Sequence, residues 1–158
     1  MKNNNQKGFT LLEILLVVAA IAILAGIVIV ALNPAKQLGD TKNAQRATDV
    51  TTILNAVYQY AIDNNGVLPT EIDNNATTYQ VLGTATTGLD TTCTAVTTEA
   101  GGVDLTSVLT PTYVVGIPLD PTAGTEANTD YYINKNGNGR ITVGACDAEE
   151  GEVIEVTR

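Results

Sequence analysis

The sequence predicts an α+β fold, in which a long N-terminal helical region covers a small antiparallel sheet. Two observations lead to this prediction. Helical periodicity fills the first part of the chain, and short β-rich segments bounded by turn residues follow towards its end. Helices and strands that are segregated in this way are typical of α+β domains. We divide the chain into a leader (1–8), a transmembrane helix (9–33), an amphipathic helix (34–66) and a β-rich globular domain (67–158).

The first predicted helix is apolar on all of its faces. It carries one charged residue, Glu13, followed by an uncharged run from Ile14 to Leu32. At about 1.5 Å rise per residue this run is nearly ~30 Å long, enough to cross the hydrocarbon core of a membrane. Asn33-Pro34 should end or kink the helix, because proline removes a backbone donor and clashes with the preceding turn.

Beyond Pro34 the pattern becomes that of an amphipathic helix. Its apolar residues recur at three- and four-residue steps and form one stripe. The stripe consists of Val50, Ile53, Leu54, Val57, Tyr58 and Ala61. Asn64-Asn65-Gly66, with Pro69 soon after, should stop this helix. The stripe is then expected to cover one face of the sheet.

The segment 70–112 is rich in Thr and has weak periodicity, so we expect a loop-rich connection with a short helix or strand near Tyr79–Leu82. Strand signals are clearer further on. They lie at Tyr113–Ile117, Tyr131–Lys135, Arg140–Ala145 and Val153–Thr157. The run Asn136-Gly137-Asn138-Gly139 between two of these segments is a strong hairpin turn signal.

Composition argues against catalysis and against binding to nucleic acid. The chain has no His, and Ser107 is its single serine. His is the commonest general base, and acyl transfer by a serine usually depends on it. The adjacent acids Glu149 and Glu150 are expected to be solvated rather than to form an acid–base pair. The formal net charge of −9 disfavours phosphate contacts, which need Lys and Arg. We therefore expect no enzyme and no specific nucleic-acid partner.

The N-terminus differs from an ordinary secretory signal, because its apolar run is too long and a glutamate stands near the beginning of that run. The segment Lys7-Gly8-Phe9-Thr10-Leu11-Leu12-Glu13 resembles the signature of type IV prepilins. In that family the prepilin peptidase, a membrane aspartyl enzyme, cuts after the glycine and the new N-terminal residue is methylated. The resemblance implies cleavage between Gly8 and Phe9, and N-methylation of Phe9.

The resemblance also implies a function and a role for Glu13. The processed chain would be a structural subunit of a type IV pilus-like surface filament with the pilin fold, assembled through its N-terminal helix as the filament core. Glu13 of one subunit would neutralise the Phe9 amine of a neighbour, since a lone carboxylate in a membrane helix costs roughly 2.5–3.5 kcal/mol on insertion scales. A second interpretation stays open: Thr10-x-x-Glu13 is also a capping-box pattern that favours the start of a helix.

The globular half has a weaker resemblance. Gly116-Ile-Pro-Leu-Asp-Pro121, followed by Tyr131-Tyr132-Ile133, is similar to a pattern in major pseudopilins of type II secretion and in some Gram-positive-type pilins. In pseudopilins this loop region can hold calcium, so the Leu119 carbonyl, Asp120 and Asp130 are candidate ligands. Asp-Pro is also a common turn opener. We expect no cofactor, with calcium as the alternative.

Lys2 and Lys7 favour a cytoplasmic N-terminus, and the Thr- and Asn-rich acidic remainder suits an exported domain. We expect a single-pass cytoplasmic membrane protein before assembly and an extracellular filament afterwards. Export would make Cys93 and Cys146 one disulfide that closes a loop of about fifty residues, the alternative being two separate thiols.

Several partners and alternative functions follow from the family resemblance. The implied partners are the prepilin peptidase, identical or related pilin subunits, the inner-membrane assembly platform and the membrane itself. The alternative functions are a pseudopilin of a type II secretion or competence system, and a minor pilin that binds DNA or surfaces.

Overall fold

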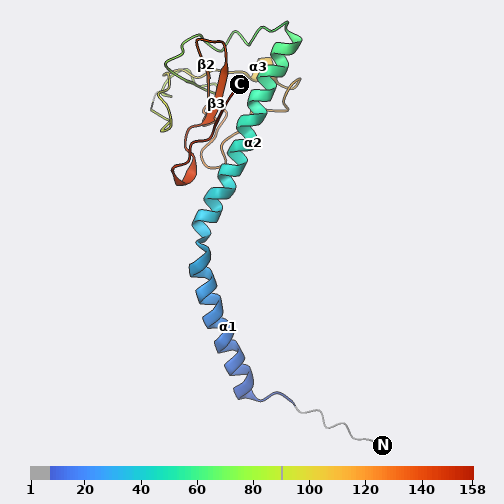
Figure 1. The fold of residues 1–158 in the computed structure, drawn as a ribbon, viewed down its shortest axis with the longest axis vertical. Coiled ribbons are helices and arrows are strands. Elements are labelled where there is room, and N and C mark those ends of the chain that lie inside the picture. The colour runs from blue at the N-terminus through green and yellow to red at the C-terminus, as the bar shows by residue number, and fades with distance from the viewer. Residues whose placement is uncertain (1–7, 90) are drawn as a thin grey trace, which may run out of the picture. The chain divides into compact units, whose positions relative to one another are not determined.

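The computed structural model describes residues 8–89 and 91–158, and it is an α+β structure (Figure 1). The elements in chain order are α1 (Leu11–Leu32), α2 (Pro34–Asp63), β1 (Gln80–Val81), α3 (Thr106–Leu109), β2 (Tyr131–Lys135), β3 (Ile141–Ala145), a 3-10 turn (Glu149–Gly151) and β4 (Glu155–Thr157). The chain forms two compact units, one ending at Leu38 and one from Gly39 to Arg158.

The first unit is dominated by α1, which ends where the sequence predicts. Asn33 adopts a left-handed conformation (φ 40°), and α2 begins at Pro34. Two hydrogen bonds organise this junction: the Gln37 side chain donates to the Leu32 carbonyl (3.0 Å), and the Lys36 amide donates to the Asn33 side chain (3.5 Å). The predicted interruption at Asn33-Pro34 is confirmed as an end to the helix.

The second unit contains a four-stranded antiparallel sheet in the order β1-β2-β3-β4. Its central hairpin pairs Ile133 with Val143 and Lys135 with Ile141. The predicted turn closes it: the Gly139 amide, at φ 78°, donates to the Asn136 carbonyl (2.9 Å). The Arg140 amide donates to the Asn136 side chain (3.0 Å). The hairpin expected from the Asn-Gly repeat is therefore confirmed.

Helix α2 packs its apolar stripe against one face of this sheet. Val50, Ile53, Leu54 and Val57 are fully buried. They belong to one core cluster with residues of β2 and β3, namely Tyr131, Ile133, Ile141 and Val143. The other face of the sheet is covered by the irregular segment before α3. Leu89 of this segment clusters with Val81 of β1, Tyr132 of β2 and Cys146. At its end α2 is closed by the Gly66 amide (φ 86°), which donates to the Ala61 carbonyl.

The prediction of a strand at Tyr113–Ile117 is wrong. The Tyr113 and Val114 amides both donate back to the Leu109 carbonyl, at 2.9 and 3.2 Å. These bonds continue the short helix α3 as a turn, so the two amides are not available to a sheet. Val115 is 96% exposed, which a buried strand would not allow. Helix α3 itself was not predicted, and the last strand begins at Glu155 rather than at Val153.

A disulfide joins Cys93 to Cys146, with their Cα atoms 4.5 Å apart. It ties the irregular segment to the residue that follows β3. Beside it, the Thr94 hydroxyl contacts the Cys146 carbonyl (3.2 Å) and the Asp147 carboxylate (2.7 Å). Of the two sequence alternatives, the structure contains the bridge rather than separate thiols.

Replacing both cysteines with serine should destabilise the globular unit. Closing a loop of this length contributes up to about 4 kcal/mol in the chain-entropy description, because the cross-link restricts the unfolded chain. Urea unfolding of the full chain in detergent micelles measures the effect. The wild type should approach the variant when a reductant is added, and equal stability of the oxidised wild type and the variant would contradict the expectation.

Candidate functional site: the N-terminal segment and the α2 ion cluster

The predicted cleavage site lies in extended, exposed chain just before α1. Gly8, Phe9 and Thr10 are outside the helix, and all three are exposed. Phe9 is 80% exposed, and Thr10 has an extended backbone (φ −82°, ψ 151°). Proteases act most readily on exposed, irregular backbone of this kind. The Gly8–Phe9 peptide bond is therefore accessible to a peptidase.

Thr10 caps the start of α1 through the backbone of Glu13. The Thr10 hydroxyl accepts a hydrogen bond from the Glu13 backbone amide (3.2 Å). The Thr10 carbonyl accepts the first helical bond, from Ile14 (3.2 Å). This cap uses the backbone of Glu13 and not its side chain. Among the described residues the Glu13 carboxylate has no ion-pair partner. Capping and pairing with a neighbour are thus compatible.

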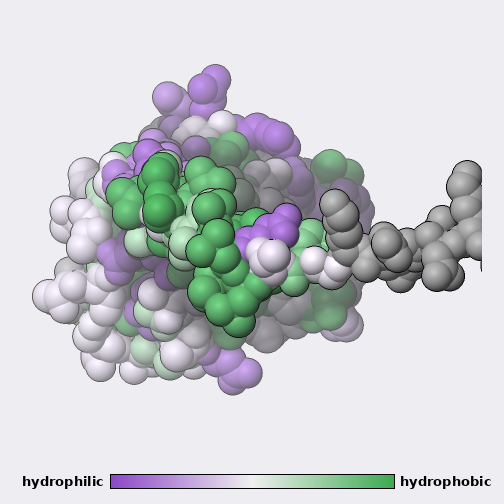
Figure 2. Space-filling model, turned by 90° about the horizontal axis from the view of Figure 1, so that it is seen from below, coloured by the Kyte–Doolittle hydropathy of each residue, from purple (hydrophilic) through white to green (hydrophobic). Residues whose placement is uncertain are grey.

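Helix α1 has no buried residue. Within residues 8–89 and 91–158 it alone is long and apolar enough to cross a membrane, by length and composition. Its large aliphatic side chains are roughly half to four-fifths exposed. Hydrophobic side chains, coloured green, face the viewer in Figure 2. A shallow groove runs along one side, lined by Ala22, Ile23, Gly26, Ile27, Val30 and Ala31. Nothing lies within 4 Å of a side chain added at Gly26. The helix surface is open to lipid or to another helix.

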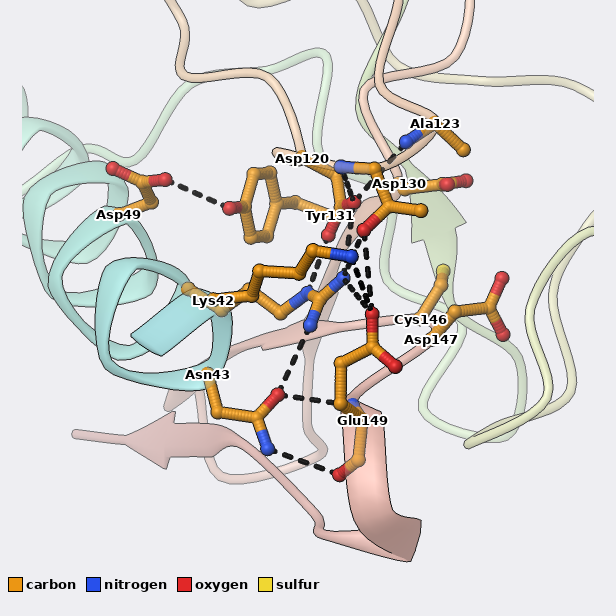
Figure 3. Close-up of polar contacts among 12 residues, drawn as sticks. Lys42, Asn43, Asp49, Asp120, Ala123, Asp130, Tyr131, Cys146, Asp147 and Glu149 are labelled. Atoms are coloured by element: carbon orange, nitrogen blue, oxygen red, sulfur yellow. Dashed lines mark hydrogen bonds and ion pairs between the residues drawn. The ribbon is translucent and has the colours of Figure 1, made fainter. Parts of the chain in front are cut away.

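The two calcium candidates lie in the globular unit, where α2 meets the loop before β2 (Figure 3). Asp120 is occupied by Arg46: Nε donates to Oδ2 (2.5 Å) and Nη2 to Oδ1 (3.2 Å). Both side chains are 1% exposed. The Thr122 and Ala123 amides also donate to Asp120 Oδ1, at 2.7 and 3.3 Å. The Asp120 carboxylate has little capacity left for a metal ion.

Three more residues complete this group: Lys42, Asn43 and Glu149. We call the six residues the α2 ion cluster: Lys42, Asn43, Arg46, Asp120, Thr122 and Glu149. Lys42 pairs with Glu149 Oε1 (3.1 Å). The Asn43 side chain donates to the Glu149 carbonyl (2.9 Å) and accepts from the Glu149 amide (2.9 Å). The cluster therefore fastens the loop after Leu119 and the 3-10 turn to α2.

The pKa values of Asp120 and Asp130 are shifted in opposite directions. Burial opposes the charge of Asp120, but hydrogen bonds from Arg46 and the Thr122 amide outweigh it and hold the pKa of Asp120 below its ordinary value. Burial likewise opposes the charge of Arg46, yet the bond and attraction of Asp120 raise the Arg46 pKa. Asp130 is 3% exposed, and burial raises its pKa.

The donor set does not fit the calcium ion that the resemblance suggests. Calcium needs several anionic or carbonyl oxygens that are free to coordinate it. Asp120 is neutralised by Arg46, and burial favours the protonated form of Asp130. Among the described residues, His, Cys, Asp and Glu form no group of three or more that could hold a metal. We therefore derive no role for calcium.

The sequence did contain a signal for the missed cluster residues. Gly39, Asn43, Arg46 and Val50 are all buried, at the same three- and four-residue steps as the apolar stripe. The stripe of α2 thus continues towards its N-terminus with polar residues. A charged residue at a core-facing helical position indicates a buried partner, and here that partner is Asp120.

Asp120→Asn should lower the free energy of unfolding by about 3–5 kcal/mol at neutral pH, because it leaves the Arg46 charge buried without its partner. The stabilisation from Asp120 is present above the unfolded-state pKa of about 3.9 and is lost as the pH falls through the lower folded-state value. Chemical unfolding of the full chain in micelles, repeated from neutral to acidic pH, measures both effects. A variant that keeps the wild-type stability and acid response would contradict this.

Asp130→Asn is the matched control. The raised pKa of Asp130 means that its charged form is disfavoured in the folded chain, so its contribution to stability falls as the pH rises through that pKa. Asn also tolerates the positive φ of 59° at this position. The Asn variant should equal or exceed the wild-type stability at neutral pH. A loss as large as that of Asp120→Asn would show that any change in this loop is harmful.

Comparison with known proteins supports both the resemblance of the N-terminal segment to prepilins and the resemblance of the chain to pseudopilins of type II secretion. Residues 3–29 match the family model described as the prokaryotic N-terminal methylation motif. The chain is 37% identical to the type II secretion system core protein G of Aeromonas hydrophila over 71 residues, 45% of this chain and 48% of that protein. It is 29% identical to the protein of the same name from Vibrio cholerae over 154 residues, 96% of this chain and 88% of the relative.

The matched region thus spans about half of the Aeromonas relative, whereas the more distant Vibrio relative is matched over most of its length. No solved structure matches the chain significantly. The N-terminal motif, the exposed apolar helix that follows it and the similarity to core protein G all agree with the resemblance of this chain to type IV prepilins and pseudopilins.

Proposed function

We propose that the chain is a structural subunit of a type IV pilus-like filament, cut between Gly8 and Phe9 and assembled through α1. The observation that carries this proposal is an apolar helix whose residues are all exposed, directly after the exposed segment that contains the predicted cleavage site. Such a helix is stable only in lipid or against other apolar helices. Cleavage at Gly8 leaves α1 attached to the globular unit, so one segment serves first as membrane anchor and then as filament core.

Glu13 gives this assembly a specific contact. Its carboxylate has no ion-pair partner among the described residues, and in lipid it would cost roughly 2.5–3.5 kcal/mol. Cleavage creates a positive amine at Phe9 on every subunit. A neighbour's amine placed against Glu13 would neutralise both charges in an apolar setting, where neither is favourable alone. The pairing supplies a register for packing as well as an attraction.

A second candidate, the pseudopilin of a type II secretion system, is favoured by the similarity to core protein G over 96% of this chain. A pseudopilin shares the N-terminal chemistry proposed above. The two candidates differ in readout: deletion of a pilus subunit removes surface filaments, whereas deletion of a secretion pseudopilin stops export of folded proteins while filaments persist. The proposed partners in either case are the prepilin peptidase, the membrane assembly platform and related subunits. No catalytic role is proposed.

Glu13→Gln should leave cleavage intact and abolish filaments, because the amide keeps the size of the side chain but cannot neutralise the Phe9 amine. The effect is measured by the mass of the processed chain in membranes and by the yield of sheared filaments. A reduction of at least tenfold in filament yield is expected. Normal filaments from this variant would refute the pairing.

Thr10→Val separates pairing from helix capping. This change removes the hydroxyl that caps the Glu13 amide but keeps the carboxylate. Loss of the cap costs about 1 kcal/mol of helix stability. We expect filaments to form in nearly wild-type yield. If Thr10→Val and Glu13→Gln lost filaments equally, helix initiation rather than charge pairing would explain the role of Glu13.

A further inference from the structure

The α2 ion cluster has the composition of a cation site with a side chain in place of the ion. Five oxygen atoms from three parts of the chain converge on the guanidinium of Arg46. They are Asp120 Oδ2 (2.5 Å), Asp120 Oδ1 (3.2 Å), Thr122 Oγ1 (3.0 Å), Asn43 Oδ1 (3.0 Å) and Glu149 Oε1 (3.9 Å). Carboxylate, amide and hydroxyl oxygens are the ligands that hard divalent cations prefer.

The position of this oxygen cage also suits a structural cation. Asp120 and Thr122 come from the loop before β2, Glu149 from the 3-10 turn, and Asn43 from α2. The three segments are far apart in sequence, and each has a side chain in contact with the Arg46 guanidinium. Structural cations in proteins typically hold such segments together. Here the side chain of Arg46 makes the same connections and is itself 1% exposed.

The charges balance without a metal. Arg46 and Lys42 supply two positive charges, and Asp120 and Glu149 supply two negative ones. Arginine suits this position because its planar fork directs several N–H donors at fixed angles and stays charged at any physiological pH. A divalent ion added to the intact cluster would bring excess positive charge and would have to displace the guanidinium.

We infer that Arg46 is an internal replacement for a divalent cation, so that the globular unit folds without calcium and acquires a calcium site only when the guanidinium is removed. The inference does not depend on the filament function, because it concerns the folding of the unit from Gly39 to Arg158. It predicts that wild-type subunits and the filaments built from them are indifferent to chelators.

The experiment compares thermal unfolding of the full chain in detergent micelles with excess EDTA and with millimolar Ca²⁺. The wild type should melt at the same temperature in both. Arg46→Gln should melt about 10 °C or more lower in EDTA, because Asp120 is left buried without a counter-charge. Ca²⁺ should restore several degrees of that loss, since the five oxygens and the new amide oxygen then surround an empty position.

Two further variants make the outcome decisive. Arg46→Lys keeps a positive charge at the position, and it should be destabilised without responding to Ca²⁺. Arg46→Gln combined with Asp120→Asn removes the carboxylate ligand, and Ca²⁺ should then have no effect. If Arg46→Gln does not fold in EDTA, recovery of its folded circular dichroism signal on adding Ca²⁺ replaces the melting temperature as the readout.

Either of two results would overturn the inference. A rise in the melting temperature of the wild type with Ca²⁺ would mean that the chain keeps a metal site beside Arg46. Failure of Ca²⁺ to stabilise or refold Arg46→Gln would mean that the oxygens around the guanidinium do not form a cation site, and that Arg46 is only one half of a buried ion pair.

Discussion

The structure depends on one constraint: helix α1 exposes apolar side chains on every face, and water is an unfavourable surrounding for all of them. At about 25 cal/mol per Å² of apolar surface, a helix of this length cannot remain solvated. In the function proposed above, lipid surrounds this helix before assembly, and equivalent helices of other subunits surround it in the filament.

Within that apolar helix the polar chemistry is confined to its first turn. Thr10 caps the helix through the amide of Glu13, and this cap does not use the Glu13 carboxylate. A helix that was only a membrane anchor would have no use for this acid. In the account proposed here, a subunit that enters the filament exchanges lipid for other helices and gains a counter-charge in the same step. The globular unit travels with it, held to α2 by an apolar stripe and by the α2 ion cluster.

Sequence periodicity was sufficient for the features that depend on local pattern. It predicted the apolar helix, its end at Asn33, the stripe from Val50 to Ala61 and the hairpin around Asn136–Gly139. It failed at Tyr113–Ile117, where β-branched residues suggested a strand but backbone bonds to Leu109 closed a turn instead. The family resemblance made Asp120 a candidate calcium ligand, but its partner Arg46 was missed, because Arg46 is 74 positions away and a single sequence does not reveal such a long-range contact.

The most direct test of the account is the mass and N-terminal sequence of the subunit recovered from assembled filaments. The account predicts a chain that begins at Phe9, with a methylated amine and with Glu13 and the whole of α1 retained. A recovered subunit that still begins at Met1, or one that begins after Leu32, would contradict it, because no new amine would then be available to neutralise the carboxylate in the filament core.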